Sequence, residues 1–181
     1  MLRLEIPLSP EGWDEVNEEF VKPQTITLQL EHSLISLSRW ESKWCKPFLS
    51  TIEKTEEETL DYIKFMTVTP NVDPEVYKHL SAQNIADINH YIYAPMTATT
   101  FREDKTKKNN REIVTSEVIY YWMIALQIPV QFEKWHLNRL LTLIRVCEAK
   151  NNPPKKRSNS EMVRDYAALN EARKKKLKTR G

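Results

Sequence analysis

The sequence predicts a mainly α protein: a compact helical domain with a small N-terminal β element and a basic C-terminal helix that projects from it. The first observation is that only two glycines occur in 181 residues. Because glycine supplies tight turns, bulges and phosphate-cradling loops, this scarcity disfavours nucleotide-binding folds and β-barrels. The second is that apolar residues recur at helical spacing, and the third is that many of these stretches begin with a capping signal.

The β element comes first. Residues 2–8 alternate apolar Leu2, Leu4 and Ile6 with charged residues, which is the period of a half-buried strand. Residues 24–31 alternate in the same way, and we expect the two segments to pair.

Four helices should come next. From Ser33 the apolar residues take a helical period that ends before Pro47. Thr55 with Glu58 forms a capping box ahead of the apolar stripe of the second helix. Asp73 precedes Pro74 as an N-cap, and Ser81 can cap a helix with isoleucines on one face.

The second half of the domain should hold its centre. Residues 96–115 predict two short extended pieces around a polar loop, a short β-hairpin. Residues 116–128 have no polar face, so this helix should be buried nearly all round. Pro129 then separates it from the aliphatic residues 134–151, and the two helices should form an antiparallel hairpin.

The composition divides the chain into a helical domain, residues 1–152, and a linker with a basic helix, residues 153–181. A second capping box, Ser158 with Glu161, should start that last helix, and its apolar stripe is thin: Met162, Tyr166 and Leu169. From Lys155 onward there are ten basic and three acidic residues, a net charge of +7. Because the whole chain carries +2, the preceding residues carry −5.

The sequence holds no catalytic, cofactor or metal motif, and we expect a protein that is not an enzyme. It lacks GxSxG, GxGxxG and P-loop patterns. His136 and Cys147 lie eleven residues apart, about 16 Å along one helix, so that they cannot share a metal there. Ligation would need His32, His79, His90 or Cys45 to converge on them, and a packed thiol with a histidine at a helix start is the better interpretation.

The protein is expected in a reducing, intracellular setting. Its two cysteines lie far apart and have no CxxC partner. No secretory signal precedes the first strand, and no apolar run reaches the roughly 18 residues that a membrane span needs.

Three groups of residues are candidates for partner binding. Asn138, Arg139, Thr142 and Arg145 form a narrow polar strip, which is a solvent-facing strip or, as the less favoured alternative, the floor of a groove. Trp40 and Trp44 are flanked by basic residues, a pattern that occurs in proteins that bind single-stranded nucleic acid. Core packing or a protein interface is the favoured interpretation. The basic end, with Arg173, Lys174, Lys175 and Lys176, could bind phosphates or an acidic partner, or be a solvated helix end.

Six blocks of the chain carry a family resemblance that extends from about Thr27 to the end. They are "TLQLEHSLISLSRWESKW", "APMTATTF", "NREIVTSEVIYYWMIALQIP", "KWHLNRLLTLIRVC", "NPPKK" and the terminal "ARKKKLKTRG". In these blocks the chain resembles the tail assembly chaperones of tailed bacteriophages, which are encoded near the tape measure protein.

The resemblance implies a non-enzymatic late protein of the host cytoplasm that binds the tape measure protein, assists tail tube subunits, and is absent from the mature virion. It also implies that ribosomal frameshifting can make a longer form, for which the codons of Lys174, Lys175 and Lys176 are candidates. Two alternatives remain: a structural tail or neck component retained in the virion, and a nucleic-acid-binding phage protein that uses the basic tail.

Overall fold

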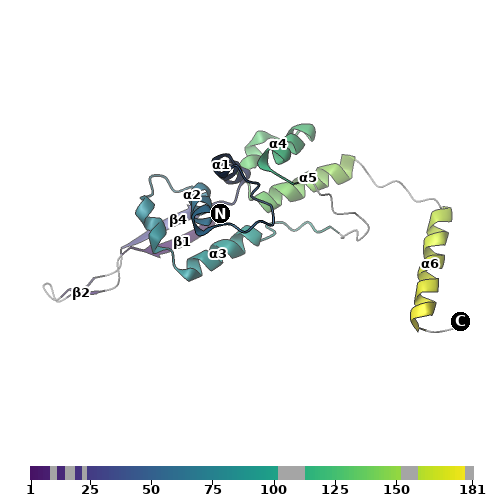
Figure 1. Ribbon diagram of the computed structural model, residues 1–181, viewed down its shortest axis with the longest axis horizontal. Helices are drawn as coiled ribbons and strands as arrows, with labels where there is room; N and C mark the ends of the chain where they lie inside the picture. The colour runs from purple at the N-terminus through teal and green to yellow at the C-terminus, as the bar shows by residue number, and fades with distance from the viewer. Residues whose placement is uncertain (9–11, 15–18, 22–23, 102–112, 152–158, 178–181) are drawn as a thin grey trace. The chain divides into compact units, whose positions relative to one another are not determined.

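The computed structural model describes residues 1–8, 12–14, 19–21, 24–101, 113–151 and 159–177. It is mainly helical with a small N-terminal antiparallel sheet, which confirms the predicted fold class (Figure 1). The chain divides into two units, Met1–Cys147 and Glu148–Gly181, each of which is described by itself. Among the described residues no helix is both long and apolar enough to cross a bilayer.

The predicted pairing of the first two strand segments is confirmed. Strands β1 (Leu2–Pro7) and β4 (Thr25–Leu30) are antiparallel, with Leu4 opposite Leu28. Their alternation places Leu4 and Ile6 in the core, while the neighbouring Arg3 and Glu5 face outward. The connection holds a second pair, β2 (Gly12–Asp14) and β3 (Glu19–Val21), which the sequence pattern did not predict.

Local capping determines where the next helices begin. Helix α1 (Leu34–Trp44) starts at a Ser33–Ser36 capping box, α2 (Glu56–Met66) at the predicted Thr55–Glu58 box, and α3 (Ala82–Tyr93) at Ser81. The predicted start at Asp73 is also correct, but the element that begins there is a short 3₁₀ helix, η1 (Pro74–His79). Both η1 and α3 pack against β1 (Figure 1).

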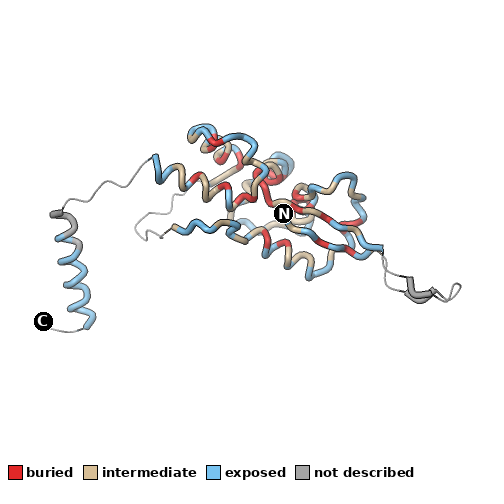
Figure 2. Tube along the Cα trace, turned by 180° about the vertical axis from the view of Figure 1, so that it is seen from behind, coloured by how far each residue is buried: buried red, intermediate tan, exposed pale blue. Residues whose placement is uncertain are grey.

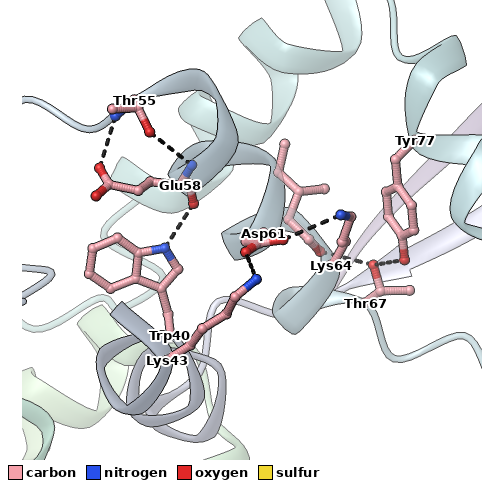
Figure 3. A network of polar contacts seen from close by, with 9 residues as sticks. Trp40, Lys43, Thr55, Glu58, Asp61, Lys64, Thr67 and Tyr77 are labelled. Atoms are coloured by element: carbon pink, nitrogen blue, oxygen red, sulfur yellow. Dashed lines mark hydrogen bonds and ion pairs between the residues drawn. The ribbon is translucent and has the colours of Figure 1, made fainter. Parts of the chain in front are cut away.

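The α1–α2 contact combines apolar packing with directed polar contacts, which Figure 3 shows from close by. The indole Nε1 of Trp40 donates to the carbonyl oxygen of Glu58 at 2.8 Å. Lys43 of α1 pairs with Asp61 of α2, and Lys64 pairs with the same carboxylate. The Trp40 and Lys43 contacts join the two helices, whereas the Lys64 contact lies within α2.

The remaining elements are α4 (Ser116–Ala125), the 3₁₀ helix η2 (Val130–Lys134), α5 (Leu137–Asn151) and α6 (Asn159–Leu177). The prediction that α4 is buried nearly all round is wrong. It buries Ile119 and Met123, one turn apart, whereas Tyr121 is 66% and Ile124 is 74% exposed. The side of α4 that carries Ile119 and Met123 packs against α1 and α5, whereas the described residues leave Tyr121 and Ile124 uncovered.

The described parts of residues 96–115 do not form the predicted hairpin. Residues 102–112 lie outside the described residues, and the flanking residues 96–101 and 113–115 form no strand. Ser158 of the second predicted capping box also lies outside them. Tyr166 and Leu169, from the expected stripe of α6, are exposed.

Figure 2 colours the buried residues red. The apolar ones form two clusters, and α1 contributes to both. Trp40 belongs to the first cluster, which joins β1 and β4 to α2, η1 and α3. Leu34 and Leu37 belong to the second, which joins α1 to α4 and α5. Helices α4 and α5, which the sequence predicts as an antiparallel hairpin, contribute to this same cluster together with α1.

The buried carboxylate of Glu41, in α1, joins that helix to the loop after it and to the start of α4. Glu41 accepts hydrogen bonds from the backbone N–H groups of Phe48, at 2.8 Å, and Ser116, at 2.7 Å. Ser116 is in the first turn of α4, whose N-cap residue Thr115 makes no side-chain cap bond. Because a helix N-terminus presents unpaired donors and a partial positive charge, Glu41 serves as its cap from another helix.

We expect Glu41→Gln to lower the free energy of unfolding by about 1–3 kcal/mol, because the amide NH₂ leaves one buried backbone N–H without an acceptor. Urea denaturation of this variant, beside Glu53→Gln at an exposed position, measures the effect. Equal stability of the two variants would contradict the capping role of Glu41.

Candidate functional site

A chain of buried aromatic and imidazole rings lies where the elements of the first unit meet. His32 and His136 are both buried, with ring centroids 5.1 Å apart in an edge-to-face arrangement. The Nδ1 atom of His32 and the hydroxyl of Tyr62 are 2.5 Å apart. Nε2 of His136 lies 3.0 Å from the carbonyl oxygen of Tyr91.

Local backbone contacts position both histidines. His32 lies between β4 and α1, and its carbonyl accepts a hydrogen bond from the N–H of Leu137 at 2.7 Å. His136 stands directly before α5 and accepts the N–H of Asn138 at Nδ1. With Nδ1 as acceptor, the proton of a neutral His136 resides on Nε2, which donates to Tyr91. The prediction of a histidine at a helix start is confirmed.

Burial makes both imidazoles resist protonation. Loss of solvation, with a smaller contribution from the nearby His136, lowers the pKa of His32 from 6.5 to about 3. Burial also lowers the pKa of His136, although the Tyr91 carbonyl and the Glu31 carboxylate oppose this effect. Both rings are therefore neutral at pH 7.

A pocket of about 260 Å³ opens beside this chain of rings. Its lining includes His32, Phe48, Lys54, Tyr62, Tyr93 and Asn138. Phe48 stacks on Tyr62 with a centroid separation of 3.9 Å, which makes one wall aromatic. Its volume lies just below the range of about 300–1,000 Å³ typical of small-molecule sites.

Lys54 places a positive charge against the aromatic wall. Its ammonium lies 4.5 Å from the centre of the Phe48 ring, a cation–π contact. Burial lowers the pKa of Lys54, while the Glu58 carboxylate acts in the opposite direction. Glu58 itself forms an ion pair with Lys46. The pocket thus combines aromatic surface with a cation that forms no ion pair among the described residues.

The candidate residues Trp40 and Trp44 take different positions. Trp40 is 1% exposed and belongs to the core, as the favoured interpretation predicts, so its ring offers no surface to a partner. Trp44 is partly buried beside it, at a centroid separation of 6.4 Å, with the Lys43 ammonium 5.2 Å from its ring. The indole Nε1 of Trp44 is buried and has no hydrogen-bond partner among the described residues.

The polar strip of α5 separates into two kinds of residue. The Asn138 amide donates to the carbonyls of Ile92, at 2.9 Å, and Ala94, at 2.8 Å, so it caps the end of α3. The solvent-facing interpretation is therefore wrong for Asn138, because its donors satisfy carbonyls that the helix end leaves unpaired. Thr142, also partly buried, donates to the Asn138 carbonyl within α5.

The two arginines of the strip are exposed, as the solvent-facing interpretation predicts. Arg139 lies 4.0 Å over the ring of Trp135, and Arg145 lies 4.3 Å over that of Phe101. Each guanidinium thus covers an aromatic ring while it remains accessible to solvent.

The remaining candidates lie apart from the pocket or in the second unit. Arg173, Lys174, Lys175 and Lys176 are exposed near the end of α6, and their role in binding stays a prediction. Cys147 packs at the second cluster, whereas His136 contacts His32 and Tyr91. Among the described residues no three His, Cys, Asp or Glu side chains form a group that could hold a metal ion.

Sequence reasoning missed two features that the structure places on the surface. The first is the apolar outer face of α4, for which the lack of any polar face was the available signal. The second is the pocket, whose lining residues come from distant segments. Lys54, which precedes the Thr55 capping box, gave no sign of its contact with Phe48.

We expect folding stability to fall as the pH drops below 6.5, because the unfolded state then binds protons that the buried histidines exclude. The stabilisation from neutral His32 is fully present above pH 6.5 and is lost progressively as the pH falls toward 3. Between pH 6.5 and 5, above the range in which carboxylates titrate, each such histidine contributes a slope of up to about 1.4 kcal/mol per pH unit.

Urea denaturation at several pH values measures this slope for the wild type, for His32→Gln and for His79→Gln, an exposed control. The slope should be smaller in His32→Gln and unchanged in His79→Gln. An identical slope in all three proteins would refute the assignment.

Comparison with protein-family models, with curated proteins and with solved structures finds no match to this chain.

Proposed function

We propose that this protein is a tail assembly chaperone of a tailed bacteriophage, which binds the helical tape measure protein and assists tail tube assembly without catalysing a reaction. The resemblance of six sequence blocks suggests the family. The structural observation that supports the proposal is the open face of α4, formed by Tyr121 and Ile124 with the exposed Glu117 one turn before Tyr121, and with Val130 exposed shortly after the helix.

This face is suited to a helical client. Tyr121 and Ile124 are three residues apart and lie on one side of α4, while Ile119 and Met123 hold the other side in the core. A partner helix laid along the open face would bury both side chains. Burial of each would contribute about 1.5–3 kcal/mol, and because association also costs translational and rotational freedom, the contact would be weak and reversible.

The second unit offers another surface of the same character. Helix α6 exposes Val163, Tyr166, Leu169 and Leu177, and its last turn carries Lys174, Lys175 and Lys176. Apolar side chains on a helix that also carries positive charge can engage an amphipathic client with acidic residues. A chaperone that holds a long client at several weak sites gains avidity from their combination.

The proposal includes the tail tube protein as a second partner and a frameshifted, longer form of the chain. It places the protein in the host cytoplasm during assembly and outside the finished particle.

Replacing both Tyr121 and Ile124 with Ser should lower the affinity for the tape measure protein at least tenfold, because the partner loses two apolar contacts. Co-purification with the tape measure protein and titration by calorimetry measure this change. Val68→Ser, at an exposed apolar position outside α4, is the control and should bind like the wild type. Unchanged binding by the double variant would exclude the α4 face.

Mass spectrometry of purified virions should detect this protein at far below the copy number of the tail subunits, because an assembly chaperone leaves before the particle is complete. The tail tube protein in the same sample is the internal standard. A stoichiometric amount in the particle would instead favour the structural tail or neck component.

A further inference from the structure

We propose that the pocket beside His32 binds an aromatic side chain next to a carboxylate, presented by an acidic–aromatic segment of a protein partner. This inference goes beyond the proposed function, because it concerns a different surface from the α4 face and does not require the tape measure protein as the partner.

The walls of the pocket select an aromatic ring. Phe48 and Tyr62 form a stacked pair on one side, and Tyr93 at the end of α3 contributes a third ring, which is 81% exposed. Aromatic rings gain edge-to-face and offset-stacked contacts in such surroundings. A volume of about 260 Å³ suits a single large side chain rather than a drug-sized ligand or an extended cofactor.

Lys54 selects the carboxylate. Its ammonium is held against the Phe48 ring and forms no ion pair among the described residues. Glu58, whose carboxylate acts on Lys54 electrostatically, is itself paired with Lys46 and accepts the N–H of Thr55. A carboxylate that enters along the Phe48 wall would meet a partly desolvated cation, for which such a partner is favourable.

The rim of the pocket favours a polypeptide over a free small molecule. The exposed ring of Tyr93 and the partly exposed Leu49 extend the apolar surface outward from the opening. Ile52, in the same loop as Lys54, is exposed as well. A small carboxylate would leave this rim in water, whereas the residues that flank an inserted aromatic side chain would cover it.

The test uses the full chain labelled with ¹⁵N and two matched dipeptides, N-acetyl-Glu-Phe-amide and N-acetyl-Gln-Phe-amide, titrated by NMR. The Glu-Phe peptide should shift the side-chain amide signals of Asn89 and Asn138, both of which line the pocket, and should bind about three- to fivefold more tightly than the Gln-Phe peptide. Equal affinity of the two peptides, or shifts elsewhere only, would overturn the proposal.

Two variants separate the two parts of the site. Lys54→Gln should reduce the affinity for the Glu-Phe peptide to that for the Gln-Phe peptide, while Lys150→Gln, at an exposed position of α5, should not change it. Tyr93→Ala, which removes a largely exposed ring, should weaken both peptides to the same degree. A Lys54→Gln variant that retains the preference for the Glu-Phe peptide would overturn the role of the cation.

Phenylacetate serves as the small-molecule probe. It should bind several-fold more weakly than the Glu-Phe peptide, because it cannot cover the rim. If it binds as tightly as the peptide, the site is one for a small carboxylate and the assignment of a protein partner fails. The Tyr121 and Ile124 double variant should bind the Glu-Phe peptide like the wild type, so that a failure of the pocket proposal is distinguishable from a failure of the α4 face.

Discussion

The turn between β4 and α1 is the constraint on which the other elements depend. Three consecutive residues there are largely removed from water, and their polar groups must find partners within the protein. Glu31 donates its N–H to the Met66 carbonyl at the end of α2, His32 accepts the N–H of Leu137, and Ser33 bridges to His136. The sheet, α2 and α5 are thereby joined through a few hydrogen bonds, and the two apolar clusters meet at this turn.

Helix ends in this protein are completed by residues far away in the sequence. Glu41 accepts the first N–H of α4, 75 residues later, and the Asn138 amide satisfies carbonyls at the end of α3, more than 40 residues earlier. Each such contact replaces a local cap with a tertiary one, so the helix ends are paired only once the surrounding elements have packed. The positions of α3 and α4 therefore depend on polar contacts as much as on apolar burial.

The sequence predicts those parts of the structure that local chemistry determines. The Thr55–Glu58 box, the Ser81 cap and the β1–β4 alternation all involve residues within a few positions of one another or a simple period, and all were confirmed. The exposure of Tyr121 and Ile124 was not predictable, because an all-apolar helix does not reveal how many of its sides will be covered. The pocket was not predictable either, since it forms from side chains between His32 and Asn138 that meet only in the folded chain.

The first cluster has a consequence for the order in which the protein can fold during its synthesis. Its described members all lie within the first 93 residues, from β1 to the last turn of α3. A ribosome adds roughly 5–20 residues per second. Several seconds therefore pass between synthesis of the first cluster and synthesis of α5, and the cluster can form in that interval. During that interval the α3 carbonyls that Asn138 later binds must be hydrated, and the imidazole of His32 has no His136 beside it. The nascent chain would thus present a partly open cluster that the emergence of α5 closes.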